Sequence, residues 1–231
     1  RPPPLIRRPA SADRLPSFAQ QRLWFLWRLD PDSAAYNIPL ALRLRGGLEP
    51  DRLERALGTV VERHETLRTV FVEADGHLRQ RIQATRPSVL ELVEIADVEQ
   101  ARWLAAAEAA RPFDLASGPL LRARLLRLAP DDHVLLLTLH HIAADAWSMR
   151  LLVDETLAVY QGAALPALPV QFADYAEWQR DWLAALPATL EPAPGGPAEA
   201  RNRRRPVLPS MNRASCRAGR GRCWPRSGAR P

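Results

Sequence analysis

The chain of 231 residues contains no lysine, so all 32 of its basic residues are arginine. It has only two cysteines, Cys216 and Cys223, too few for a disulfide framework, which favours a reducing compartment. No apolar run reaches the length of about 18 residues that a membrane-spanning helix needs, and the N-terminus lacks the pattern of a signal peptide. These absences predict a soluble cytoplasmic protein without membrane partners.

The positive charge is concentrated at one end. Residues 191–231 carry ten arginines against two glutamates, whereas the remainder of the chain is close to neutral. Nucleic-acid binding would therefore rest on this tail alone, and we do not expect it. The Pro, Gly, Ala and Arg-rich composition of 187–231 predicts disorder, and translation of GC-rich DNA out of frame is a second hypothesis for the same residues. Residues 1–14 are expected to form a linker, which leaves 15–186 as the folded domain.

Helical and strand-like periodicities alternate through this domain, which predicts an α/β layered fold. Asp75-Gly76 is expected to close a β-hairpin, and the strand ending at Leu139 is apolar on both faces, so it should lie inside a sheet. Trp24, Phe25 and Trp27 are expected in the core. Helices are predicted within 17–29, 50–64, 98–111, 146–162 and 170–186, and strands within 38–45, 67–82, 89–97 and 119–141.

The stretch LHHIAADAWSM (139–149) contains the residues best suited to chemistry. Neighbouring side chains on a strand point to opposite faces, so only one of His140 and His141 can face outward, where it could act as a general base. Asp145 could brace that imidazole, pair with an arginine, or cap the helix that follows. Taken alone, the cluster is explained better by a packed strand end than by an active site, and a metal site is explained less well still.

Four segments change that balance: SFAQQRLWFL (17–26), RHETLRTVF (63–71), HHIAADAWS (140–148) and FADYAEWQ (172–179). In order and spacing they resemble the first four signature motifs of the condensation domains of nonribosomal peptide synthetases, and YNIPLALRLRG (36–46) is also similar to that family. The resemblance covers residues 15 to about 185. It implies a two-layer sandwich related to chloramphenicol acetyltransferase, forming the N-terminal lobe of a two-lobed domain with the active site in a tunnel between the lobes.

The resemblance also implies the reaction and the partners. Donor and acceptor peptidyl carrier proteins bring thioesters on phosphopantetheine arms, and the acceptor amine attacks the donor thioester to form an amide bond. Condensation domains bind no cofactor or metal themselves, and they work beside adenylation domains. The C-terminal lobe that completes the tunnel is not recognisable in this sequence, so we expect this chain to be inactive alone.

The resemblance implies a role for each residue of the third motif. His141 is the active-site residue, and His140 and Asp145 support it, with Asp145 expected in a salt bridge to an arginine. Ala146 stands where the family pattern HHxxxDG has glycine, which would strain the backbone if the position requires a positive φ. The other expected supporting residues are Arg63, Arg68, Trp147 and Ser148.

Two alternatives to amide formation remain. The chain could be a carrier-protein-binding lobe or a remnant without catalysis, which the missing second lobe favours. It could also be an acyltransferase of the same HHxxxD superfamily that uses coenzyme A, although YNIP and FADYAEWQ argue against this.

Overall fold

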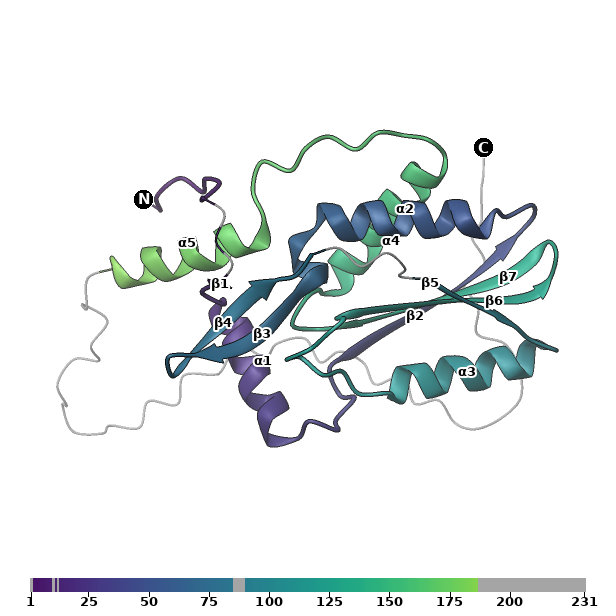
Figure 1. Cartoon of the computed structure of the whole chain (residues 1–231), viewed down its shortest axis with the longest axis horizontal. Coiled ribbons are helices and arrows are strands. Elements are labelled where there is room, and N and C mark those ends of the chain that lie inside the picture. Colours follow the sequence, from purple (N-terminus) through teal and green to yellow (C-terminus); the bar gives the residue numbers. More distant parts are fainter. Residues whose placement is uncertain (1, 10, 12, 85–89, 187–231) are drawn as a thin grey trace, which may run out of the picture. The chain divides into compact units, whose positions relative to one another are not determined.

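The computed structural model describes residues 2–9, 11, 13–84 and 90–186, so the disorder and out-of-frame hypotheses for 187–231 lie outside the described residues. Helices and strands alternate along this part of the chain (Figure 1), which confirms the predicted α/β class. The elements are β1 (Asp13–Arg14), α1 (Phe18–Leu29), β2 (Asn37–Arg45), α2 (Pro50–Arg63), the 3-10 helix η1 (Glu65–Arg68), β3 (Thr69–Ala74), β4 (His77–Ile82), β5 (Leu90–Glu94), α3 (Val98–Ala110), β6 (Leu121–Ala129), β7 (Asp132–His140), α4 (Ala146–Tyr160) and α5 (Phe172–Ala184).

The larger sheet has four strands in the order β2-β7-β6-β5. β7 pairs antiparallel with both neighbours, so that Leu137 lies opposite Leu40 of β2 and Ala123 of β6, whereas β5 pairs parallel to β6. The apolar run of β7 therefore occupies an inner strand, as predicted, and its last six residues are all buried.

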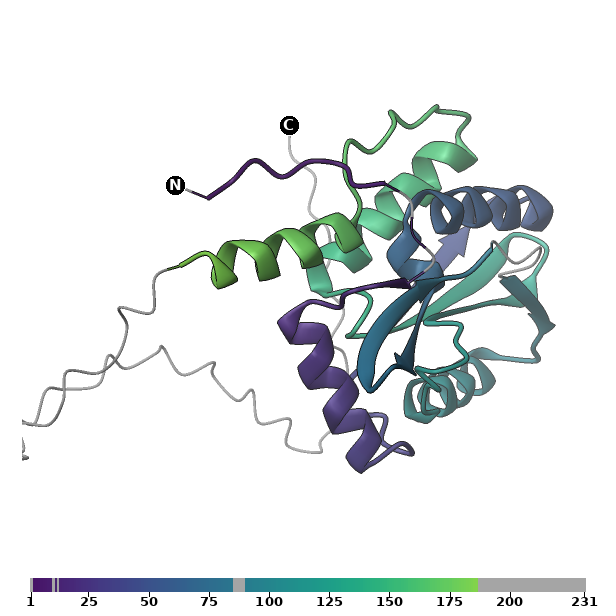
Figure 2. The same cartoon turned by 60° about the vertical axis from the view of Figure 1, so that its left-hand side comes forward.

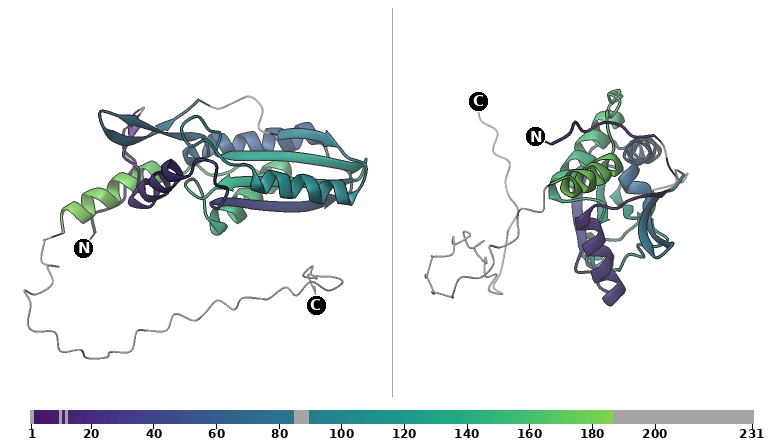
Figure 3. Two further views of the ribbon diagram at one scale, coloured as in Figure 1. Left: turned by 90° about the horizontal axis from the view of Figure 1, so that it is seen from below. Right: turned by 90° about the vertical axis from the view of Figure 1, so that its left-hand side faces the viewer.

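Helices cover both faces of this sheet. α2 and α4 pack together on one face, and α3 lies across the opposite face (Figure 1; Figure 3, left). Alternate residues of β7 divide between the two cores, since Leu137 packs with α2 and α4 while Leu136 packs with α3. A strand buried on both sides in this way has its register fixed by two hydrophobic surfaces at once.

The smaller sheet has the order β1-β4-β3 and packs against α1. Its hairpin turns at Asp75 and Gly76, both with positive φ (52° and 72°), as the Asp-Gly pair predicted. Trp24 is buried against Phe71, and Trp27 is partly buried, but Phe25 is 60% exposed. The prediction for Phe25 was wrong because the buried face of α1 follows Gln20, Leu23 and Trp24.

Part of the segment predicted to be a linker contacts α5 (Figure 2). The Trp178 indole donates to the Pro3 carbonyl (2.7 Å), and the Arg8 amide donates to Asp174 (3.0 Å). Arg14, which is buried, pairs with Glu177 (2.8 Å) and with the buried carboxylate of Asp174 (3.4 Å). α5 is thus attached largely by arginine–carboxylate contacts.

None of the helices in the described ranges is long and apolar enough to cross a membrane.

We predict that Asp174→Ala weakens the attachment of α5. Asp174 is 1% exposed and also accepts from the Gln171 amide, so its removal leaves a buried arginine without one of its partners and the Gln171 amide without its acceptor. Removing one partner of a buried ion pair costs about 3–5 kcal/mol. Hydrogen exchange of the amides in 172–184 should show a loss of that order in their opening free energy.

Asp181→Ala is the matched control, because Asp181 on the same helix pairs with Arg8 from a side chain that is 62% exposed. Exposed pairs contribute about 1 kcal/mol or less. Equal effects of the two substitutions would contradict the argument from burial.

Candidate active site

The two histidines at the end of β7 have opposite environments. His140 is 3% exposed, with its ring beside Tyr36 (centroids 6.2 Å apart) and in a T-shaped pair with Phe113 (5.9 Å), and its Nδ1 accepts from the Ile142 amide (3.1 Å). His141 follows the last strand residue, is exposed, and donates its backbone N–H to the Tyr36 carbonyl (2.9 Å). One imidazole therefore packs inside and the other is accessible, as the strand geometry predicts.

Burial lowers the pKa of His140 from 6.5 to about 4, and the neighbouring His141 contributes to the same shift. The ring is accordingly neutral near pH 7. Because its Nδ1 accepts a hydrogen bond from Ile142, the proton of the neutral ring is assigned to Nε2. His140 thus stabilises the turn between residues 140 and 142 from within the protein.

Asp145 is the N-cap of α4. Its Oδ1 accepts from the amide (2.8 Å) and the hydroxyl (2.7 Å) of Ser148, and these hydrogen bonds hold the pKa of the carboxyl below its usual range. The salt bridge to an arginine that we expected is not formed within the part of the chain that the structure describes. The helix cap takes its place, since a capping carboxylate satisfies the free N–H groups of the first turn.

Ala146 and Trp147 begin the same helix. Asp75 is the one described residue other than glycine with a positive φ, so Ala146 carries none of the strain that its substitution for glycine suggested. Trp147 is 79% exposed, so its expected role as a support of the histidines, which stays a prediction, is not reflected in burial.

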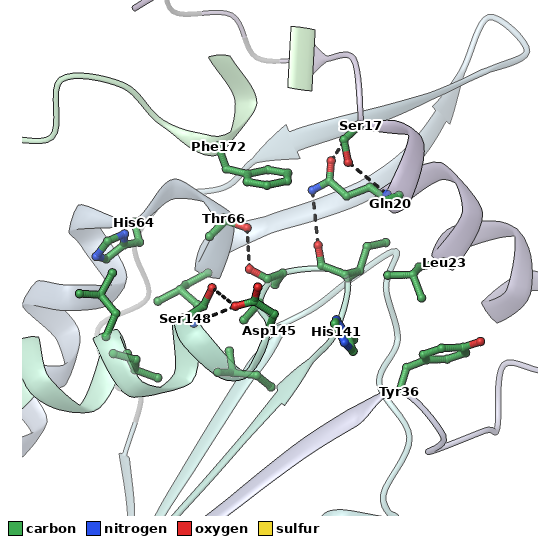
Figure 4. A pocket seen from close by; sticks show the side chains of 18 of the residues that line it. Ser17, Gln20, Leu23, Tyr36, His64, Thr66, His141, Asp145, Ser148 and Phe172 are labelled. Carbon is green, nitrogen blue, oxygen red and sulfur yellow. Dashed lines mark hydrogen bonds between the residues drawn. The ribbon is translucent and has the colours of Figure 1, made fainter. Parts of the chain in front are cut away.

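A cavity of about 460 Å³ lies beside His141 (Figure 4). The cavity is also lined by Tyr36, just before β2, by His64, at the end of α2, and by Phe172 of α5. The full lining is Ser17, Ala19, Gln20, Arg22, Leu23, Tyr36, His64, Thr66, Leu67, Leu139, His141, Ile142, Ala143, Ala144, Asp145, Ser148, Leu151, Leu152 and Phe172. All four segments that resemble the signature motifs (17–26, 63–71, 140–148 and 172–179) contribute residues to this lining.

Two polar residues that we did not single out hold the turn after His141. Gln20 is buried and donates from Nε2 to the Ile142 carbonyl (3.4 Å), while the Thr66 hydroxyl donates to the Ala143 carbonyl (3.1 Å). The Gln20 side chain also completes a capping box with Ser17 at the start of α1. The spacing Ser-x-x-Gln is typical of a capping box and could have indicated a structural role for Gln20. No short sequence pattern indicates the role of Thr66.

Arg63 and Arg68 brace the surroundings of the cavity. Arg63 pairs with Glu155 of α4 (3.3 Å) and donates to the Pro166 carbonyl. Arg68 donates to the Gln83 carbonyl (2.6 Å), after β4. Their contacts fix the end of α2 against α4 and against the smaller sheet, without reaching the histidines directly.

The chemical capacity of the site lies in a single accessible imidazole. Within the described ranges, no three histidine, cysteine or acidic side chains are arranged to hold a metal ion. His64, which also faces the cavity, is engaged through its Nε2 with Glu155 (2.7 Å). This arrangement suits hydrogen bonding to, or proton transfer from, a group that enters the cavity beside His141.

We predict that the fold loses stability in acid partly through His140. Its folded pKa lies below the ordinary value, so the unfolded chain binds the proton more readily, and stability present at neutral pH is lost as the pH falls from 6.5 to about 4. The loss amounts to at most about 3 kcal/mol. Chemical denaturation of His140→Gln between pH 7 and pH 4 should show a dependence smaller by that order than wild type. An equal slope for wild type and His140→Gln would contradict the assignment.

Comparison with known proteins places this geometry in a family. The family model described as "Condensation domain" matches residues 13–185. A linear gramicidin synthase chain from Brevibacillus parabrevis is 50% identical over 183 residues, which cover 74% of this chain and 4% of that protein. Phosphinothricin tripeptide synthetase PhsC from Streptomyces viridochromogenes is 42% identical over 194 residues, which cover 78% of this chain and 18% of that protein. The chain therefore spans a small part of the curated relatives it matches.

Solved structures agree over the same region. The X-domain in its complex with OxyB from teicoplanin biosynthesis superposes with a TM-score of 0.72 at 34% identity, covering 79% of this chain and 41% of that one. The starter condensation domain of rhizomide synthetase RzmA gives a TM-score of 0.68 at 28% identity, and the match covers 75% of this chain and 44% of that one. Because the family model extends over most of the chain and includes both histidines and the cavity, this chain belongs to the condensation domain family and contains less than half of the length of its solved members.

Proposed function

We propose that this chain is the histidine-bearing lobe of a condensation domain that forms amide bonds between carrier-bound thioesters in nonribosomal peptide synthesis. The observation that carries the proposal is the presence of one accessible imidazole, His141, in a cavity formed by all four resembling segments. One of its relatives, phosphinothricin tripeptide synthetase PhsC, is named for the synthesis of a peptide, which supports the proposal.

The chemistry follows from the position of His141. An acceptor amine attacks the carbonyl carbon of the donor thioester, a C–N bond forms, the C–S bond breaks, and the thiol leaves with a proton. His141 hydrogen-bonds the amine in the cavity, takes up the proton that the amine loses and passes it to the leaving sulfur. His140 and Asp145 act indirectly: the neutral ring of His140 holds the turn, and Asp145 holds the start of α4.

The partners follow from the same proposal. Donor and acceptor carrier proteins present the thioesters on phosphopantetheine arms, so that the chain itself needs no bound cofactor. Adenylation domains load those carriers, and a C-terminal lobe supplies the other wall of the cavity, all within the cytoplasm. The share of the solved relatives that this chain covers, 41% and 44%, supports the need for such a lobe.

A second candidate function is the binding of a partner protein without catalysis. The observation in its favour is that one solved relative, the teicoplanin X-domain, was determined in a complex with OxyB. Binding of a carrier protein without formation of product would support this candidate.

We predict that product formation depends on His141. The chain, combined with the C-terminal half of the condensation domain from a relative and with loaded donor and acceptor carriers, should form a dipeptidyl thioester detectable by mass spectrometry. The chain without that half should form none. His141→Ala should lower the rate about 10²- to 10⁴-fold, the usual contribution of a positioned acid or base.

His77→Ala is the control, because His77 lies at the start of β4 outside the cavity lining. It should retain the wild-type rate. Product formation that survives His141→Ala would contradict the catalytic proposal, and turnover of acyl-coenzyme A in place of the carrier thioester would favour the other acyltransferase class.

A further inference from the structure

The loop that follows α3 lies against the buried side of His140. Phe113, which is 3% exposed, meets the His140 ring edge-on, with an interplanar angle of 74°. The backbone of the loop is held from two other elements, since the Trp27 indole donates to the Phe113 carbonyl (2.9 Å) and the Phe71 amide donates to the Leu115 carbonyl (2.9 Å). The loop thus connects the smaller sheet and α1 to the strand that carries the histidines.

Arg122 of β6 is the cation beneath this loop. Its guanidinium donates to the carbonyls of Pro112 (3.0 Å), Arg111 (2.8 Å) and Glu108 (3.2 Å), where α3 ends at residue 110. The Arg111 carbonyl also accepts from the Asn37 side chain (2.8 Å), and the Glu108 carbonyl also accepts from the Arg111 amide (3.3 Å). Its central carbon lies 3.7 Å from the centre of the Phe113 ring, within the range of a cation–π contact.

Arg122 is also paired with the carboxylate of Glu108, and the two side chains are only 10% and 3% exposed. Stability alone does not require such a buried pair, because apolar residues of similar volume often stabilise a core as well or better. The planar fork of an arginine does something that an apolar residue cannot, since it fixes three carbonyls and one aromatic face in a single geometry.

The contacts form a continuous series from Arg122 to the cavity. Arg122 lies over the face of Phe113, Phe113 and His140 form a T-shaped ring pair, and His140 accepts a hydrogen bond from the amide of Ile142. The turn closed by this hydrogen bond contains His141, which lines the cavity.

We propose that Arg122 is a positioning residue for His141, acting through Phe113 and His140. It holds the Phe113 ring in the orientation that packs His140, and so keeps the turn that presents His141 to the cavity. The kinetic consequence rests on the proposed function above, whereas the structural link between Arg122 and the histidines does not.

The structural link can be tested on the whole chain of 231 residues labelled with ¹⁵N-histidine, which has five histidines to assign by single substitutions. The main variant is Arg122→Met with Glu108→Gln, which removes the pair without leaving a buried charge. We expect the imidazole signals of His140 and His141 to move. The signals of His133, which lies on the same strand seven residues away, should stay in place.

Two further variants separate positioning from general packing. Arg122→Lys keeps the charge and loses the fork, so it should move the same two histidines to a smaller extent while the chain stays folded. Arg124→Met is the matched control, because Arg124 lies on the same face of β6 and pairs with Glu91 (2.9 Å), while its approach to Glu108 is longer (3.9 Å). It should leave all five histidine signals unchanged.

The kinetic consequence is measured in the domain completed with a relative's C-terminal half. Arg122→Met with Glu108→Gln should lower kcat about 10- to 100-fold, the scale expected from misplacement of a catalytic group. KM should change little, because no contact to substrate is removed. Arg122→Lys should recover part of kcat, and Arg124→Met should match wild type.

A lower melting temperature with unchanged His140 and His141 signals, in either Arg122 variant, would show that Arg122 only stabilises the fold and would overturn the proposal. If the wild-type domain makes no product while the histidine signals still respond to Arg122, the proposed function fails and the positioning role stands.

Discussion

The structure depends on the burial of β7 on both of its faces. An inner strand packed against α2 and α4 on one side and α3 on the other cannot slip by one residue without moving every side chain into the wrong core. This constraint reaches the last residue of the strand, where His140 is held inside and the next residue is free to leave the sheet. The different environments of two identical neighbouring side chains follow from this packing, which extends along the strand as far as Leu139 and continues in the contacts of His140 with Tyr36 and Phe113.

Much of the site could be predicted because its determinants are local. Alternation on a strand separates His140 from His141, and an aspartate just before a helical pattern is a favoured N-cap, as Asp145 is here. The turn at Asp75-Gly76 follows from the same kind of short-range rule. These features need only the few residues on either side of them.

The features that we did not predict depend on tertiary contacts. Whether Phe25 or Trp24 is buried depends on where the smaller sheet meets α1, and the helical period alone allows both. The contacts of Thr66 and Gln20 with the carbonyls of the turn join residues 77 and 122 positions apart. We expected an arginine as the partner of Asp145. Instead, the amide and hydroxyl of Ser148, three residues further on, stabilise the negative charge of its carboxylate.

Both ends of the described domain lie along one helix. The Trp178 indole bonds the carbonyl of Pro3, and α5 ends at residue 184, about 9 Å further along the helix axis. A short designed connection could therefore join residue 186 to residue 2, and the chain could be opened at the exposed turn of the β3–β4 hairpin. Such a circular permutant would keep every contact of the four-stranded sheet, and it would place new termini at the hairpin while the cavity and its histidine stay intact.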